Sequence, residues 1–124
     1  MTTATAEPTV ARRVHDLQDY IRQGRILDAM NEFYDAAVSM QENNTAPTVG
    51  LAANIEREKN FLAYVKQWVG YEVRSINVGP DTSAVESTLE FHAVDGKHIV
   101  INQVAVQRWN NGKIVSERFY YNAA

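Results

Sequence analysis

Apolar residues recur at steps of three and four positions through the first half of the chain, which is the spacing of amphipathic helices. The pattern predicts a first helix over residues 9–24, ended by Gly24, and a second helix over residues 25–34. A third helix is predicted from residue 51 to near Gly70. The apolar face of this third helix consists of Leu51, Ile55, Leu62, Val65 and Val69.

The remaining segments have the alternation and the β-branched and aromatic content of strands. One short strand is predicted at residues 37–42, followed by a loop at residues 43–50 that is rich in Asn, Thr, Pro and Gly. Four long strands follow the third helix, at residues 71–78, 83–94, 98–109 and 114–122. The turn sequences Gly-Pro-Asp, Asp-Gly and Asn-Asn-Gly separate them. This order predicts an α+β fold with three helices on one face of a strongly curved antiparallel sheet.

Length and composition narrow the class of protein. The 124 residues, 45% of them hydrophobic, suit one globular domain at residues 9–124 preceded by a disordered N-terminus at residues 1–8. A net charge of −3 without a local cluster of Lys and Arg predicts no nucleic-acid partner. The first residues lack a signal-peptide pattern, and no apolar run is long enough to span a bilayer. We therefore expect a soluble cytoplasmic protein with no membrane partner.

Residue patterns for metal, cofactor or covalent chemistry are absent from the sequence. The chain has no cysteine, which excludes disulfides, thiolate metal ligands and thiol nucleophiles. Its three histidines, His15, His92 and His98, do not have metal-binding spacing. The sequence also contains no glycine-rich phosphate loop and no Gly-x-Ser-x-Gly nucleophile motif. We expect neither a metal nor a cofactor.

Three segments carry a resemblance to a known family: the helix ending in QGR, the segment FYDAAVSMQENNTAPTVG and the closing hairpin RWNNGKIVSERFYYN. With the order of elements, they resemble the SnoaL-like branch of the nuclear transport factor 2-like superfamily over residues 10–122. The resemblance implies a cystatin-like cone whose mixed or antiparallel sheet wraps round the long helix and encloses a pocket. Members include ketosteroid isomerases, polyketide cyclases, epoxide hydrolases, dehydratases and binders without catalysis, so the chemistry stays open.

The same resemblance can be followed residue by residue. Glu42 falls where the ketosteroid isomerases have their aspartate base. Leu17 and Ala105 fall where those enzymes have the tyrosine and the protonated aspartate that polarise the ketone, so steroid isomerisation is not expected. Asn122 falls near the acid/base aspartate of the cyclases. A neutral amide does not transfer a proton, which argues against cyclase chemistry at that position.

Glu42 is also a candidate from its local pattern. Val38, Met40 and Glu42 share one face of the predicted strand, so an acid lies on a face otherwise suited to burial. If Glu42 is buried, its pKa rises towards neutrality and it becomes a general base. The alternative is a charge at the pocket rim that faces solvent or pairs with an arginine.

The strand at residues 83–94 has two possible registers. In one register Thr88, Glu90 and His92 face the pocket, where the carboxylate could orient the imidazole. In the other register Leu89 and Phe91 face the interior and the polar set is outside. The second register is slightly favoured because apolar residues usually face the core.

The last two strands contribute further polar candidates. Comparison with the isomerases places Gln103, Gln107 and Trp109 inside, where the amides would either bind a polar ligand or pair across the sheet. The same register turns Glu117 inward, so that Glu117 and Glu42 could divide acid and base roles, unless Glu117 forms a salt bridge. The candidate catalytic residues are Glu42, Glu117 and His92. The candidate ligand-binding residues are Met40, Tyr64, Trp68, Glu90, Gln103, Gln107, Trp109, Phe119, Tyr121 and Asn122.

Three functions remain open from the sequence. The first is a binding pocket, without proven catalysis, for a hydrophobic small molecule with a few polar groups. The second is a cofactor-free isomerase, cyclase or dehydratase that uses Glu42 or Glu117 as general acid or base. The third is a dimerisation module. In each case the exposed valines of the outer sheet face, Val100, Val104 and Val106, predict a homodimer through that face.

Overall fold

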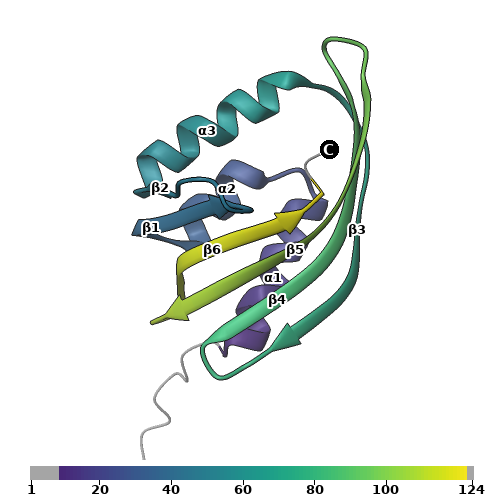
Figure 1. Ribbon diagram of the computed structural model, residues 1–124. Helices are drawn as coiled ribbons and strands as arrows, with labels where there is room; N and C mark the ends of the chain where they lie inside the picture. Colours follow the sequence, from purple (N-terminus) through teal and green to yellow (C-terminus); the bar gives the residue numbers. More distant parts are fainter. Residues whose placement is uncertain (1–8, 123–124) are drawn as a thin grey trace, which may run out of the picture.

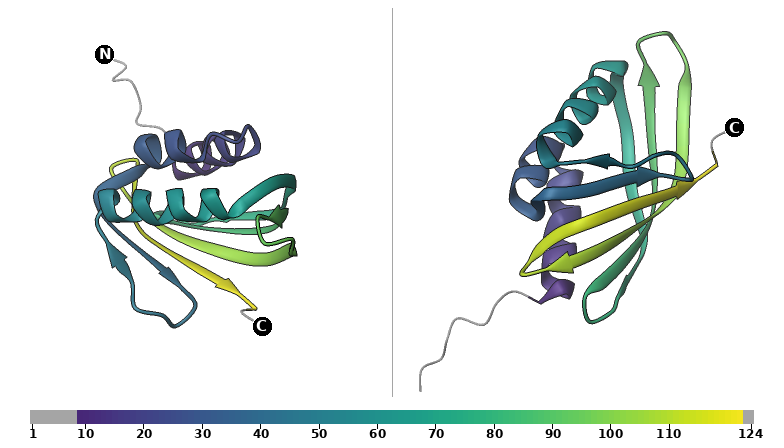
Figure 2. Two further views of the ribbon diagram at one scale, coloured as in Figure 1. Left: turned by 90° about the horizontal axis from the view of Figure 1, so that it is seen from above. Right: turned by 60° about the vertical axis from the view of Figure 1, so that its left-hand side comes forward.

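A curved sheet with three helices on its concave side organises the protein (Figures 1 and 2). We describe residues 9–122 of a computed structural model, so the expected disorder of residues 1–8 lies outside the described residues. The helices are α1 (Val10–Arg22), α2 (Ile26–Phe33) and α3 (Leu51–Tyr64). None of the helices within residues 9–122 is long and apolar enough to cross a membrane.

The sheet has six strands and a mixed topology. Its strands are β1 (Tyr34–Glu42), β2 (Thr48–Val49), β3 (Val65–Val78), β4 (Thr82–Ala93), β5 (His98–Asn110) and β6 (Lys113–Tyr121). They lie in the order β2-β1-β6-β5-β4-β3, with β1 parallel to β6 and all other neighbours antiparallel. The predicted α+β class and the cone with three helices on a curved sheet are confirmed.

The predicted end of the third helix near Gly70 is wrong, because α3 stops at Tyr64 and β3 begins at the next residue. The apolar residues of the wrongly assigned stretch, Val65, Trp68 and Val69, fit a helical face by spacing, yet they are β-branched or aromatic. Trp68 pairs with Phe91 and Gly70 with Glu90, so β4 satisfies the backbone groups of this stretch. Periodicity over so short an apolar run does not distinguish a helix from a strand.

The first strand and the following loop also differ from the prediction. Strand β1 begins at Tyr34 rather than at residue 37, directly after α2. Within the predicted loop, β2 pairs with β1 through Ser39 opposite Val49 and Met40 opposite Thr48. Because β1 begins earlier, the Tyr34 side chain is placed against the core, where it is 7% exposed.

Register shifts shape the sheet and interrupt the simple alternation of faces. Three shifts occur between β3 and β4, and one occurs where β5 pairs with β6, between Arg108 and Trp109. Such irregularities bend a strand and increase its twist. At the shift in the β5–β6 pair, Ile114 lies opposite Trp109 and is fully buried, whereas strict alternation from Glu117 had placed it on the outer face.

The hydrophobic core lies where α1 and α2 cross the concave face near β1 and β6. Its most buried members are Val14, Leu17, Phe33, Val38 and Ile114. These side chains fill only the end of the cone at which α1 and α2 meet the sheet. Next to this core the cone encloses a cavity that is lined by residues of all three helices and of the sheet.

Candidate functional site

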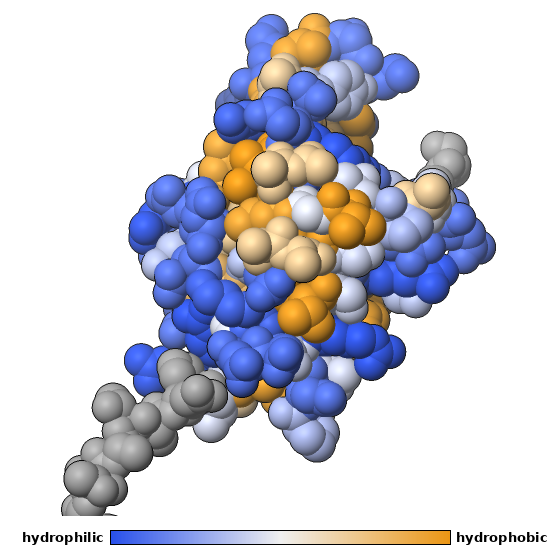
Figure 3. Space-filling model, turned by 90° about the vertical axis from the view of Figure 1, so that its left-hand side faces the viewer, coloured by the Kyte–Doolittle hydropathy of each residue, from blue (hydrophilic) through white to orange (hydrophobic). Residues whose placement is uncertain are grey.

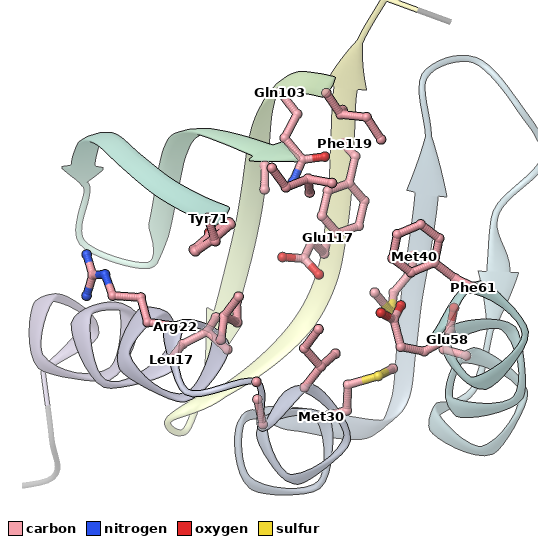
Figure 4. Close-up of a pocket in the computed structure, with 18 of the residues that line it drawn as sticks. Leu17, Arg22, Met30, Met40, Glu58, Phe61, Tyr71, Gln103, Glu117 and Phe119 are labelled. Atoms are coloured by element: carbon pink, nitrogen blue, oxygen red, sulfur yellow. The ribbon is translucent and has the colours of Figure 1, made fainter. Parts of the chain in front are cut away.

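A cavity of about 710 Å³ lies between the helices and the concave face of the sheet. Leu17 of α1 and Met30 of α2 form one wall, and Phe61 of α3 forms another (Figure 4). Phe119 and Gln103 face it from β6 and β5 (Figure 4). The volume is in the range that encloses a small organic molecule, and most of the lining is hydrophobic or aromatic.

One row of side chains crosses four strands at the bottom of this cavity. Ser83 of β4 lies opposite Gln107 of β5, Gln107 lies opposite Glu117 of β6, and Glu117 lies opposite Met40 of β1. Because directly opposed residues point to the same face, the sheet register alone brings Ser83, Gln107 and Glu117 together. All three are at least 97% buried.

Hydrogen bonds run along this row in one direction. The Trp109 Nε1–H donates to Ser83 Oγ at 2.9 Å, and the Ser83 hydroxyl donates to Gln107 Oε1 at 2.7 Å. The Gln107 amide then donates through Nε2 to Glu117 Oε2 at 2.7 Å. An indole can only donate, so Trp109 sets the direction of every bond that follows. The row therefore presents an N–H donor to one oxygen of Glu117.

Tyr34 completes the surroundings of the Glu117 carboxyl. Its hydroxyl donates to Glu117 Oε1, so each carboxyl oxygen accepts one hydrogen bond from the protein. The pKa of Glu117 is raised from 4.5 to about 7, mainly by burial and to a smaller extent by the nearby Glu58 carboxyl. The hydrogen bonds from Tyr34 and Gln107 act in the opposite direction and lower this pKa. Burial and the Glu117 charge in turn raise the pKa of Tyr34 well above its usual value, which keeps the phenol protonated.

Glu58 supplies a second carboxyl to the same cavity from α3 (Figure 4). Burial raises its pKa from 4.5 to about 7; the Glu42 charge raises it as well, and the Arg57 charge lowers it. Sequence reasoning missed Glu58 although a signal was present. It lies three residues after Ile55 and four before Leu62, so it interrupts the apolar face of the helix.

Glu42 lies at the rim of the cavity. This placement agrees with the alternative prediction of a rim charge that faces solvent or pairs with an arginine. Its Oε2 is 2.6 Å from Arg57 Nη2, and its Oε1 accepts a hydrogen bond of 3.1 Å from the Tyr121 hydroxyl. The side chain is 40% exposed. A carboxylate that is paired with an arginine and open to water is a poor match for a buried base.

A model described as the SnoaL-like domain matches residues 3–121. The chain belongs to the SnoaL-like domain family. No curated protein sequence matches it.

Solved structures share the fold of this SnoaL-like domain at low sequence identity. One, from Mesorhizobium loti and provisionally assigned as a SnoaL-like polyketide cyclase, is 21% identical with a TM-score of 0.79, over 91% of this chain and 99% of that one. A provisionally assigned isomerase from Bacillus subtilis is 15% identical with a TM-score of 0.75, over 90% and 85%. A protein from Catenulispora acidiphila with a ketosteroid isomerase-like fold, in complex with trimethylamine, is 12% identical with a TM-score of 0.74, over 89% and 85%.

Within this SnoaL-like domain, the β4 strand adopts the register with Leu89 and Phe91 inside, so His92 and Glu90 lie on the outer face. The ring of His92 stacks on His98 with centroids 4.9 Å apart, and Glu90 Oε2 is 2.5 Å from His98 Nε2. The expectation that His92 is catalytic and Glu90 binds ligand is therefore corrected. Phe91 is 1% exposed and packs against Phe61, so it faces inward. His92 and Glu90 would have to face inward in its place to be catalytic or to bind ligand.

The other predicted residues divide between the cavity and its surroundings. The cavity of the SnoaL-like domain is lined by Met40, Glu42, Trp68, Gln103, Gln107, Glu117, Phe119 and Tyr121. Trp109 is 5% exposed and serves the hydrogen-bonded row rather than the cavity surface. Tyr64 donates a hydrogen bond to Asp95 at 2.9 Å in the turn after β4, and Asn122, the last described residue, is exposed. These three placements also correct the expected ligand contacts.

Several cavity residues were not predicted, and three of them have acidic or phenolic side chains. Glu58 and Tyr34 surround the candidate centre, and Tyr71 lines the cavity with its hydroxyl 2.5 Å from Gln18 Oε1. Within residues 9–122, no three His, Asp or Glu side chains gather as they would around a metal ion. The titratable groups at the centre of the cavity are thus two carboxyls and two phenols.

Proposed function

We propose that this SnoaL-like domain is a cofactor-independent enzyme that moves a proton on a small hydrophobic molecule, with Glu117 as the general base and acid. The observation that supports it best is the position of Glu117. The carboxyl is 3% exposed at the wall of a cavity large enough for a substrate, and both of its oxygens are held by donors. A base whose pKa lies near neutrality combines a useful ionised fraction with good basicity.

The geometry supports a simple sequence of proton movements. Ionised Glu117 removes a proton from a substrate carbon next to a carbonyl, and the electron pair of that C–H bond moves to the carbonyl oxygen as an enolate. The side-chain amide of Gln103, which lines the cavity, is the candidate donor of a hydrogen bond to this oxygen. Protonated Glu117 then returns the proton at another carbon, which isomerises the substrate, or to a leaving hydroxyl group, which dehydrates it.

The sequence suggested Glu117 as a possible base and Gln107 as a possible ligand contact, and only the second role is changed here. Both ends of the Gln107 amide are engaged, since its Oε1 accepts from Ser83 and its Nε2 donates to Glu117. Gln107 therefore supports the base instead of contacting an oxyanion. Gln103, four residues before Gln107 on β5, lines the cavity and remains a candidate contact for a polar group of the substrate (Figure 4).

Carboxyl-carbon NMR titration of the ligand-free protein tests the proposal directly. We expect Glu117 and Glu58 to titrate near pH 7, in accord with their raised pKa values. The variants Glu117→Gln and Glu58→Gln assign the two signals, because each removes one of them. If both groups titrate near the ordinary value of 4.5 instead, neither is poised as a base and a binding protein without catalysis replaces the proposal.

We also propose that the protein is a homodimer through the outer face of the sheet. Val100 and Val104 of β5 are 50% and 36% exposed, and Val104 pairs with Tyr120 of β6, which is 44% exposed. Light scattering after gel filtration is expected to give a dimer for the natural protein. The double change Val100→Lys and Val104→Lys should give a monomer, because it places two charges in the interface.

A matched control for this experiment lies on another side of the molecule. Val49 of β2 is 66% exposed, and the side carrying β1 and β2 faces the viewer in Figure 3, where hydrophobic side chains form a patch bordered by hydrophilic ones. Val49→Lys should leave the dimer intact. A natural protein that is a monomer, or a dimer lost only with Val49→Lys, contradicts the proposed interface.

A further inference from the structure

We infer that the substrate of this cavity carries a protonated amine, which binds at the α3 wall beside Glu58 while Glu117 acts on the rest of the molecule. The inference rests on the proposed function for the role of Glu117 and adds the chemical class of the substrate. It is argued from the charges and the aromatic rings of the cavity.

The first argument is the balance of charge inside the cavity. Neither Glu58 nor Glu117 forms an ion pair with any residue from 9 to 122. The two arginines that line the cavity are engaged at its rim: Arg57 with Glu42 at 2.6 Å, and Arg22 with Asp19 at 2.8 Å. The charge of Arg57 lowers the pKa of Glu58, but the interior of the cavity holds two carboxyls and no cationic side chain among the described residues. A ligand cation supplies the missing charge.

The second argument is the set of aromatic rings that line the same cavity as Glu58. Phe61 lies one turn further along α3 and points into the same cavity, and Phe119 faces it from β6 (Figure 4). Trp68, whose ring centroid is 6.1 Å from that of Phe61, and Tyr121 also line the cavity. The faces of aromatic rings attract cations, and a carboxylate beside such rings is a recurrent way to bind an ammonium group.

Together these features select against other classes of ligand. A carboxylate or phosphate would meet two carboxyls in a poorly solvated space, where like charges repel strongly. A neutral hydrocarbon would leave the carboxyl of Glu58 without a partner. An alkyl or aryl ammonium ion matches the charge and the rings at once, and its N–H groups can donate to the Glu58 carboxyl.

Isothermal titration calorimetry near neutral pH tests the inference with four probes of similar size. These are phenethylamine and benzyltrimethylammonium as cations, phenethyl alcohol as a neutral compound and phenylpropionate as an anion. Both cations are expected to bind at least about tenfold more tightly than the alcohol, and the anion to bind most weakly. Phenethylamine should be the tighter of the two cations because it alone has N–H donors.

Variants of α3 locate the effect. Glu58→Gln keeps the size of the side chain and should reduce the preference for cations over the alcohol to less than about threefold. Glu56→Gln is the matched control, since Glu56 is on the same helix with its side chain 71% exposed, and it should leave the preference unchanged. Circular dichroism confirms that both variants fold. An alcohol that binds as well as the cations, a preference that survives Glu58→Gln, or no binding of either cation overturns the inference.

The outcome can be separated from that of the proposed function. Binding is measured without turnover, and Glu117→Gln should keep most of the cation preference because it leaves Glu58 in place. If Glu117 titrates near neutrality but cations are not preferred, the substrate class is wrong and the proton-transfer function stands. If cations are preferred but Glu117 titrates as an ordinary glutamate, the cavity is an amine-binding site without the proposed base.

Discussion

Replacing Glu117 with glutamine should lower the rate of carbon deprotonation in the cavity by about 10²- to 10⁴-fold, the usual contribution of a positioned general base. Glutamine keeps the shape of the side chain and can still bond to Gln107, but it cannot accept a proton. A suitable probe is a nitrobenzisoxazole, whose ring opens when a base removes its C–H proton and releases a coloured phenolate. The rate in the natural protein should rise with pH and reach half its maximum near pH 7, because only ionised Glu117 is active.

Two further variants make this experiment specific. Glu42→Gln should change the rate by less than about tenfold, since Glu42 is paired with Arg57 at the rim and is not the base. Tyr34→Phe should move the midpoint of the pH profile upwards, because the Tyr34 hydroxyl lowers the pKa of Glu117 by hydrogen bonding to it. A Glu117→Gln protein that opens the probe as fast as the natural protein contradicts the proposed role.

The free energy of unfolding should fall as the pH rises from about 4.5 to about 7, and then level off. Between these values Glu117 and Glu58 hold their protons in the folded protein but lose them in the unfolded chain, so proton binding favours the folded state at the lower pH. For Glu117 the difference between 4.5 and about 7 corresponds to at most about 3 kcal/mol. Urea denaturation at about pH 5 and about pH 8 measures it.

The Glu117→Gln variant isolates this contribution. It should be nearly neutral at about pH 5, where the carboxyl is already protonated, and should stabilise the protein relative to the natural chain at about pH 8, where it removes a buried charge. Glu58→Gln should act in the same direction. A stability that rises steadily over this range in the natural protein, or is unaffected by Glu117→Gln, contradicts the raised pKa values.

The sequence predicted those parts of the site that depend on strand alternation alone. Gln103, Gln107, Glu117 and Phe119 belong to long strands with clear turns, and comparison with the isomerases placed them inside, where they are. Alternation alone could not decide the register of β4, because the polar residues Glu90 and His92 alternate with the apolar residues Leu89 and Phe91 and either set could face inward. The structure resolves it through Phe91, which packs against Phe61 of α3, a contact across 30 positions of the chain.

The unpredicted parts depend on long-range contacts or on local irregularity. Tyr34 reaches Glu117 across 83 positions, and its place at the junction of α2 and β1 had no pattern of its own. The early end of α3 depends on pairing of residues 65–70 with β4, which local spacing does not reveal. Glu58 is different, since a carboxyl in the apolar face of a helix was visible in the sequence and can serve as a signal elsewhere.

The direction of the hydrogen bonds from Trp109 also decides where the proton of Glu117 can sit. If the acid proton lay on Oε2 and pointed at Gln107, the amide would have to flip and donate its N–H groups to Ser83. Ser83 would then receive donors from both Gln107 and Trp109, and its own hydrogen would have lost its acceptor. The Trp109 indole, at the far end of the row, thus disfavours the flipped orientation of the Gln107 amide. It leaves the acid proton of Glu117 directed towards Tyr34 or towards the molecule that occupies the cavity.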